Sequence, residues 1–253
     1  MKYRVLGCSG GEAPGFRLSS FLVEDRLLID TGSVAVALEV SEQARIDHIL
    51  LTHSHLDHTG GLPLLADNIF GMRAAPVQVH GMAPTLDGVR RNLLNDVLWP
   101  NFTRIPSNAF PTLLYREVPE DGPFELAGFT ITAIRVNHTV ECAAYFIQGR
   151  AGTLLHIGDT GPTEAVWGHA RTVHRLLAVC VETTFPNRLQ EIAEASGHLT
   201  PQGLDKELEK LDRDVPVFVY HLKPHFRSEI LAELKRLRRR ALHVLEDGTL
   251  YRF

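Results

Sequence analysis

The most informative segment of this sequence runs Thr52-His53-Ser54-His55-Leu56-Asp57-His58. It follows the apolar stretch Ile46 to Leu51, whose isoleucines and leucines predict a buried strand. Four side chains that can bind metal therefore lie within six positions at a strand end, where a loop can turn them into one cavity. Three imidazoles and a carboxylate suit zinc, iron or manganese better than calcium. The segment predicts a metal site in preference to a polar surface turn.

A site for two metal ions needs ligands from other strand ends as well. Three polar residues have that placement, because each follows an apolar stretch and a β or βα unit separates it from the next. They are His138 after 130–136, Asp159 after 154–157 and His221 after 215–220. Taken alone, each could be an ordinary turn, loop or exposed strand-end residue. Together with the His-x-His-x-Asp-His segment they predict one shared metal site.

This order of ligands resembles the motifs of the metallo-β-lactamase superfamily, from about Leu6 to His221. Asp30, in Leu28-Ile29-Asp30-Thr31-Gly32, is similar to that family's first motif, an aspartate that supports the metal loop without binding metal. The resemblance implies two zinc ions with a bridging hydroxide, although manganese or iron would also suit these ligands. It implies that His53, His55 and His138 bind one ion, that Asp57, His58 and His221 bind the other, and that Asp159 bridges both.

The expected elements favour an α/β fold, an αββα four-layer sandwich of two mixed β-sheets flanked by helices. Hairpins and β-α alternation occur in both halves, which is the pattern such a sandwich needs. We expect a single domain, 1–253, with an insert at about 81–119. Within it, Trp99-Pro100-Asn101-Phe102 could either cover the site and stack on a purine or fill the core. The detailed expectations are helical patterning at 58–70, a helix at 83–98, a loop-rich segment at 100–119, a helix at 228–240 and a closing hairpin of 242–245 with 250–253.

Further segments resemble the class II cyclic-nucleotide phosphodiesterases in particular. They are Ile157-Gly158-Asp159-Thr160-Gly161-Pro162, the stretches 182–187 and 195–201, Tyr220-His221-Leu222-Lys223-Pro224, and the stretch 92–102. This resemblance implies metal-dependent hydrolysis of 3′,5′-cyclic AMP, with cyclic GMP as an alternative substrate, to the nucleoside 5′-monophosphate. A homodimer is usual for that family.

His198 is the candidate that would give a proton to the departing 3′ oxygen, and Glu182 could orient its ring. A plainer interpretation is that His198 only precedes a helix, because Thr200-Pro201 has the form of an N-cap followed by a first-turn proline. With Asp57, these two residues are the candidate catalytic residues. The RNase Z branch places a similar Glu and His in the same order, so the alternative function is that of a tRNA 3′-end endonuclease or of another phosphodiesterase with the metallo-β-lactamase fold. Its RNA-binding arm would be rich in Gly, Lys and Arg, and 81–119 is not.

Composition argues against several other classes. The net charge of −4 offers no general attraction for nucleic acids or membranes, so we expect a small-molecule substrate and no stable nucleic-acid or membrane partner. Three widely spaced cysteines, Cys8, Cys142 and Cys180, predict neither a disulfide framework nor a cysteine zinc site. The N-terminal stretch lacks the apolar run of a signal peptide, and we expect a cytoplasmic enzyme.

Overall fold

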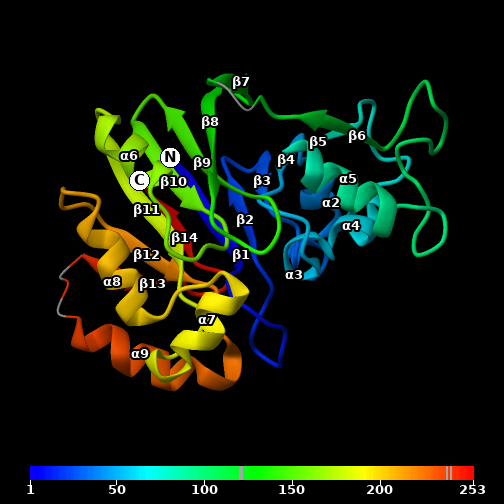
Figure 1. Cartoon of the computed structure of the whole chain (residues 1–253). Helices are drawn as coiled ribbons and strands as arrows, with labels where there is room; N and C mark the ends of the chain where they lie inside the picture. The colour runs from blue at the N-terminus through cyan, green and yellow to red at the C-terminus, as the bar shows by residue number, and fades with distance from the viewer. Residues whose placement is uncertain (120–121, 238, 240) are drawn as a thin grey trace.

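The computed structural model describes residues 1–119, 122–237, 239 and 241–253. Two sheets of seven strands form the centre of the molecule (Figure 1). The strands of the first sheet are Lys2–Gly7 (β1), Ser20–Val23 (β2), Leu27–Ile29 (β3), His48–Leu50 (β4), Val77–Gly81 (β5), Leu113–Glu117 (β6) and Leu250–Arg252 (β14), in the order β14-β1-β2-β3-β4-β5-β6. Pairing is antiparallel from β14 to β3 and parallel from β3 to β6.

The second sheet has the same size and the same mixed character. Its strands are Phe124–Leu126 (β7), Phe129–Val136 (β8), Cys142–Gly149 (β9), Gly152–Ile157 (β10), Leu176–Glu182 (β11), Val217–Tyr220 (β12) and Leu242–Val244 (β13), in the order β13-β12-β11-β10-β9-β8-β7. Strands β10 to β13 are parallel and β7 to β10 antiparallel.

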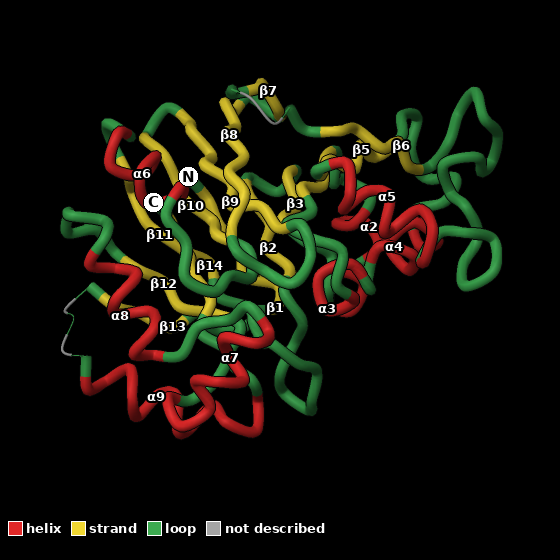
Figure 2. Tube along the Cα trace, in the orientation of Figure 1, coloured by secondary structure: helices red, strands yellow, loops and turns green. Residues whose placement is uncertain are grey.

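Helices cover the outer face of each sheet (Figure 2). The helices beside the first sheet are Val34–Ala37 (α1), Val40–Gln43 (α2), Leu56–Thr59 (α3), Leu62–Asn68 (α4) and Ala83–Asn92 (α5). Those beside the second are Ala165–Thr172 (α6), Gln190–Ser196 (α7), Pro201–Glu209 (α8) and Arg227–Arg236 (α9), with short 3₁₀ turns at Asn187–Leu189 and Pro224–Phe226.

Three apolar clusters separate these four layers. One lies between the sheets and includes Phe21 and Tyr145, one joins the first sheet to its helices, and one joins the second sheet to its helices. The strands β3 and β11 are apolar at nearly every position because both of their faces are buried. The prediction of an αββα sandwich is confirmed. No helix in the described part of the chain has the length and apolar character needed to cross a membrane.

The predicted closing hairpin is wrong. Leu242–Val244 (β13) pairs with β12 in the second sheet, whereas Leu250–Arg252 (β14) pairs with β1 in the first. The Asp247-Gly248 turn therefore carries the chain from one sheet to the other. Asp247 fixes this crossing, because its carboxylate accepts hydrogen bonds from the backbone N–H groups of Cys8 and Arg17.

The segment 83–119 also differs from expectation. The helix predicted to reach residue 98 ends at Asn92, because the Asn95 side chain accepts hydrogen bonds from the N–H groups of Val97 and Leu98 and builds a turn there. The segment 100–119, predicted to be loop-rich, contains β6 as the edge strand of the first sheet. The predicted insert at 81–119 thus contributes a strand to the sandwich.

Two other helical segments are shorter than predicted. The patterning at 58–70 is divided into α3 and α4 at Gly60-Gly61, where a Cβ on Gly61 would meet the Thr31 carbonyl oxygen at 2.0 Å. Helix α9 ends at Arg236, and the end of the predicted 228–240 helix includes residues 238 and 240, which lie outside the described part of the chain.

Trp99 and Phe102 belong to the core and do not cover the site. Phe102 is buried in the cluster between the first sheet and its helices, and Trp99 packs against that cluster. Of the two predicted roles of this turn, the structure therefore favours filling the core.

Candidate metal centre

The predicted ligands meet where four strands end. His53 follows β4 in the first sheet, while His138, Asp159 and His221 follow β8, β10 and β12 in the second. Strands β8, β10 and β12 run in the same direction, so their carboxyl ends share one edge of the sheet. The loop after β4 and the helix α3 bring the remaining ligands to that edge. All seven predicted ligands lie together in two groups.

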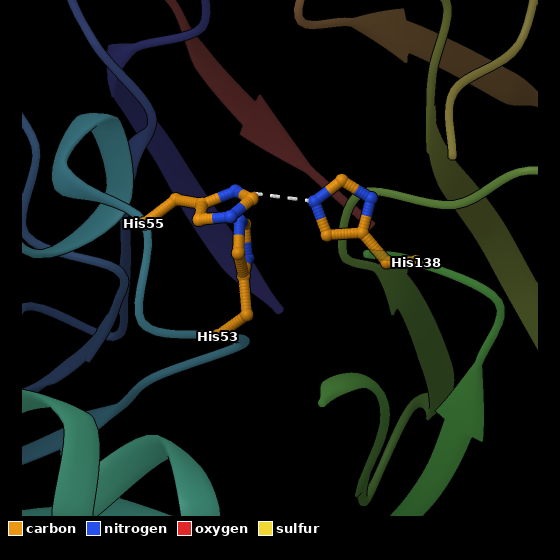
Figure 3. A group of neighbouring side chains, drawn as sticks. All are labelled: His53, His55 and His138. Carbon is orange, nitrogen blue, oxygen red and sulfur yellow. Dashed lines mark hydrogen bonds between the residues drawn. The ribbon is translucent and has the colours of Figure 1, made fainter. Parts of the chain in front are cut away.

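The first group consists of His53, His55 and His138, with one ring nitrogen of each within 4.8 Å of the others. Figure 3 shows the His55 and His138 rings facing each other across the gap between the two loops, with Nδ1 of His55 3.2 Å from Nε2 of His138. Burial lowers the pKa of all three histidines, most strongly that of His53. The neutral imidazole that results is the form that binds metal.

The second group consists of Asp57, His58, Asp159 and His221, again with one ligand atom of each within 4.8 Å of the others. Oδ2 of Asp159 lies 3.3 Å from Nε2 of His58, 3.2 Å from Nε2 of His221 and 3.8 Å from Nε2 of His53. Asp159 therefore faces both groups. Burial raises the pKa of its carboxyl, but the neighbouring His221 and His58 outweigh that effect and hold the pKa well below its usual range.

Two buried atoms at this centre indicate that these residues fit a cation. Nε2 of His53 and Oδ1 of Asp159 are buried and have no hydrogen-bond partner among the described residues. Such a group typically costs about 1–3 kcal/mol when it is left unsatisfied. A divalent metal ion bound by both atoms would satisfy them, and the imidazole and carboxylate donors are those that zinc accepts.

Asp30 lies behind the second group and holds the metal loop. Its carboxylate is fully buried and accepts hydrogen bonds from the Thr52 N–H at 2.8 Å, from the Thr52 hydroxyl at 2.7 Å and from Nδ1 of His58 at 2.7 Å. The Thr52 hydroxyl lies 3.1 Å from Nδ1 of His53. These contacts leave Nε2 of both histidines directed at the ligand groups. Asp30 thus contacts both the strand end and a proposed ligand, and its supporting role stays a prediction.

The Glu182–His198 pair lies beside the two groups. Oε1 of Glu182 accepts a hydrogen bond from Nδ1 of His198 at 3.0 Å and another from the Leu199 N–H at 3.0 Å. The His198 ring centre is 5.0 Å from that of His138 and 5.4 Å from that of His221. Burial lowers the pKa of His198, but the Glu182 carboxylate outweighs it, so the pKa is raised. Thr200 does cap α8, and the same short loop also directs His198 to the site.

A family model described as a beta-lactamase superfamily domain matches residues 25–221, a range that contains every ligand of both groups. The chain belongs to the metallo-β-lactamase superfamily. Asp30 and the seven predicted ligands all lie within the matched range, and the fold agrees with the family.

Relatives of this superfamily member include a cyclic-nucleotide phosphodiesterase and a ribonuclease Z. The chain is 26% identical over 272 residues to a 3′,5′-cyclic-nucleotide phosphodiesterase of Aliivibrio fischeri, covering 87% of this chain and 80% of the relative. It is 36% identical over 228 residues to a ribonuclease Z of a Bradyrhizobium species, covering 69% of this chain and 73% of that relative. Unliganded yeast PDE1 has the same fold, with a TM-score of 0.82 at 17% identity over 98% of both chains. The coarser prediction, a phosphodiesterase of the metallo-β-lactamase superfamily, is supported by these relatives.

The sequence analysis missed residues of this metallo-β-lactamase fold that contact the ligands without binding metal. Gly10 lies where a Cβ would meet the His221 carbonyl oxygen at 2.4 Å, and His221 itself has a left-handed backbone with φ of 66°. The hydroxyls of Thr52 and Thr184 contact ligand histidines. For Thr52, the sequence indicates such a contact only through its position directly before His53. For Thr184 the sequence offers only its position two residues after Glu182.

Proposed function

We propose that this protein hydrolyses 3′,5′-cyclic nucleotides, cyclic AMP or cyclic GMP, to nucleoside 5′-monophosphates with two zinc ions. The observation that carries the proposal is the hydrogen-bonded Glu182–His198 pair beside two groups of metal-binding side chains. The pair can supply a proton where the metals would hold a phosphoryl group. The cyclic-nucleotide phosphodiesterase of Aliivibrio fischeri, which aligns with 87% of this chain, supports the choice of substrate class.

In this proposal the two ligand groups hold one zinc ion each. His53, His55 and His138 would bind the first, Asp57, His58 and His221 the second, and Asp159, which faces both groups, would bridge them. When bound, two such ions polarise phosphoryl oxygens and lower the pKa of water at the site towards ~7. Burial raises the pKa of the Asp57 carboxyl, but the neighbouring His221 and His58 rings outweigh burial and lower this pKa, so Asp57 is held as a carboxylate.

The chain's own part in the reaction is proton transfer and orientation. Cleavage of the bond between phosphorus and the 3′ oxygen leaves an alkoxide that needs a proton. Nδ1 of His198 is committed to Glu182, so Nε2 is the atom that can carry this proton to the 3′ oxygen. The raised pKa of His198 keeps the ring protonated to a higher pH than an unpaired buried histidine would allow.

The test is hydrolysis of cyclic AMP by protein of measured zinc content, scored for 5′-AMP. We expect metal-dependent 5′-AMP formation by the parent protein and none by Asp57→Ala. Asp67→Ala changes an exposed aspartate of α4 and serves as the matched control, with parent activity expected. The absence of turnover for both cyclic AMP and cyclic GMP, at two zinc ions per chain, would reject the proposal.

A tRNA 3′-end endonuclease of the RNase Z kind is the second candidate. The 36% identity to the Bradyrhizobium ribonuclease Z favours it, over a smaller share of this chain than the phosphodiesterase match. Cleavage of a precursor tRNA with a 3′ trailer by the same zinc-loaded protein distinguishes the two. Trailer release without 5′-AMP formation would select this function in place of the first.

A further inference from the structure

Thr184 lies where the metal ligands and the Glu182–His198 pair meet. It follows β11 by two residues and is fully buried. Its hydroxyl oxygen is 2.7 Å from Oε2 of Glu182 and 2.9 Å from Nδ1 of His221. Nδ1 of His198 lies at 3.2 Å from the same oxygen. One hydroxyl therefore contacts a ligand histidine and both members of the proposed proton-transfer pair.

The direction of these hydrogen bonds follows from counting hydrogens. A threonine hydroxyl has one hydrogen, and a carboxylate can only accept, so Thr184 donates to Glu182. The hydroxyl oxygen is then an acceptor for the Nδ1–H of His221. With Nδ1 protonated, Nε2 of the neutral ring carries the lone pair. That nitrogen lies 3.2 Å from Oδ2 of Asp57 and faces the second ligand group.

We propose that Thr184 is a positioning residue that sets the tautomer of His221 and couples this ligand to the Glu182–His198 pair. Outer partners of ligand histidines fix ring orientation and the nitrogen available to metal. The proposal rests on the metal site of the proposed function and does not depend on which phosphodiester is the substrate. Thr52 provides an internal precedent, since its hydroxyl contacts Asp30 and Nδ1 of His53 in the same way.

The side chain of Thr184 can be tested separately from its backbone. The Thr184 N–H donates to the Leu199 carbonyl, and the Thr184 carbonyl accepts from the Lys223 N–H. Both backbone contacts remain when the side chain is changed. Thr183 is an adjacent control, because it is also fully buried and its hydroxyl donates to the backbone carbonyl of Glu182 without contacting a histidine.

The experiment compares Thr184→Val, Thr184→Ser and Thr183→Val by metal binding. Zinc affinity is measured by competition with a chromogenic chelator, and the visible spectrum of the Co²⁺-loaded protein reports the ligand set. For Thr184→Val we expect about 10–100-fold weaker binding of one of two metal equivalents and a changed cobalt spectrum. Thr184→Ser keeps the hydroxyl, so its zinc affinity and cobalt spectrum should match those of the parent, and Thr183→Val should behave in the same way.

Three results would overturn the inference, two of them from the variants and one from the parent protein. Parent-like binding of both ions with an unchanged cobalt spectrum in Thr184→Val would show that the hydroxyl does not position His221. Equal losses in Thr184→Ser and Thr184→Val would assign the effect to side-chain shape.

Thermal unfolding of the metal-free variants shows which of them fold, and Thr184→Ala replaces Thr184→Val if the latter does not. Because these readouts need no substrate, a failed cyclic-nucleotide assay leaves the inference standing, whereas a parent protein that binds neither zinc nor cobalt overturns both.

Discussion

The two halves of the molecule hold their histidines with the same set of contacts. In the first, the Asp30 carboxylate accepts from the Thr52 hydroxyl at 2.7 Å and from His58 directly, and Thr52 contacts His53. In the second, the Glu182 carboxylate accepts from the Thr184 hydroxyl, also at 2.7 Å, and from His198 directly, and Thr184 contacts His221. Each half thus has a buried carboxylate, a threonine and two histidines.

The difference lies in where the histidines point. His53 and His58 are both fully buried and both belong to the ligand groups, so we assign the whole first network to metal binding. In the second network only His221 is a proposed ligand. His198 is partly exposed, with 11% of its side chain accessible, which suits contact with a substrate. The same arrangement can therefore serve coordination in one half and proton transfer in the other.

Among the substitutions that test this comparison, Asp30→Asn should have the largest effect on zinc binding and on the free energy of unfolding. The amide removes the negative charge and one of the acceptors for Thr52 and His58, which leaves buried donors unpaired. Breaking a buried charged network in this way typically costs about 3–5 kcal/mol. We expect loss of zinc after dialysis and a lower free energy of unfolding in urea. Retention of both zinc ions at parent stability would contradict the role of Asp30.

Glu182→Gln tests whether the second network serves proton transfer and the first serves metal binding. The amide oxygen can still accept from Thr184, so zinc content should stay close to that of the parent. Loss of the charge that raises the pKa of His198 should lower kcat by about 10²–10³-fold, within the usual range for a positioned acid or base. The assay is steady-state hydrolysis of cyclic AMP at known zinc content. Zinc loss as large as that of Asp30→Asn would mean that both networks serve coordination.

His156 is a buried histidine whose ring nitrogens face tyrosine hydroxyls in place of a hydrogen-bonded carboxylate. Burial lowers its pKa to about 3, and its ring contacts the Tyr3 hydroxyl at 3.0 Å. The unfolded chain, with a pKa near 6.5, therefore binds a proton that the folded chain does not. The contribution of His156 to the free energy of unfolding is fully present above pH 6.5. It falls by roughly 1.4 kcal/mol per pH unit as the pH drops towards 3.

The measurement is urea unfolding in EDTA between pH 6.5 and 5, comparing the parent with His156→Gln. The variant should lose less stability over this range, because one proton no longer binds on unfolding. His174→Gln changes an exposed histidine and should keep the parent slope. Identical slopes for the parent and His156→Gln would show that this histidine is not held neutral.

The smallest effect is expected for one of the hydrogen bonds that join the two halves. The Tyr145 hydroxyl on β9 donates to the Leu51 carbonyl at 2.7 Å, next to the metal loop of the other sheet. Tyr145→Phe should cost about 1 kcal/mol in unfolding free energy, the usual value for one such bond. Tyr115→Phe is the matched control, because the buried Tyr115 hydroxyl has no hydrogen-bond partner among the described residues. An equal cost for both variants would show that the contact with Leu51 contributes nothing.

The fold class and the grouping of the proposed ligands could be predicted from the sequence, because apolar runs indicate where strands end. His138, Asp159 and His221 each follow such a run, and parallel strands deliver them to one edge. The Thr184 contacts could not be predicted, since they depend on which atoms of Glu182 and His221 come within reach after two strands have paired. The prediction of a closing hairpin was wrong for a related reason. The Asp247-Gly248 sequence indicates a turn, but it does not specify which sheet the next strand joins.

The return of β14 to β1 affects the order in which the fold can be completed during synthesis. Strand β1 pairs with residues 250–252, so one of its edges has no partner until these residues have been synthesised. Residues 25–221 contain all the proposed ligands, yet a fragment limited to them would lack β1, β2 and β14 of the first sheet and β13 of the second. Closure of the first sheet therefore depends on a contact that spans nearly the whole chain, and such long-range pairings fold slowly.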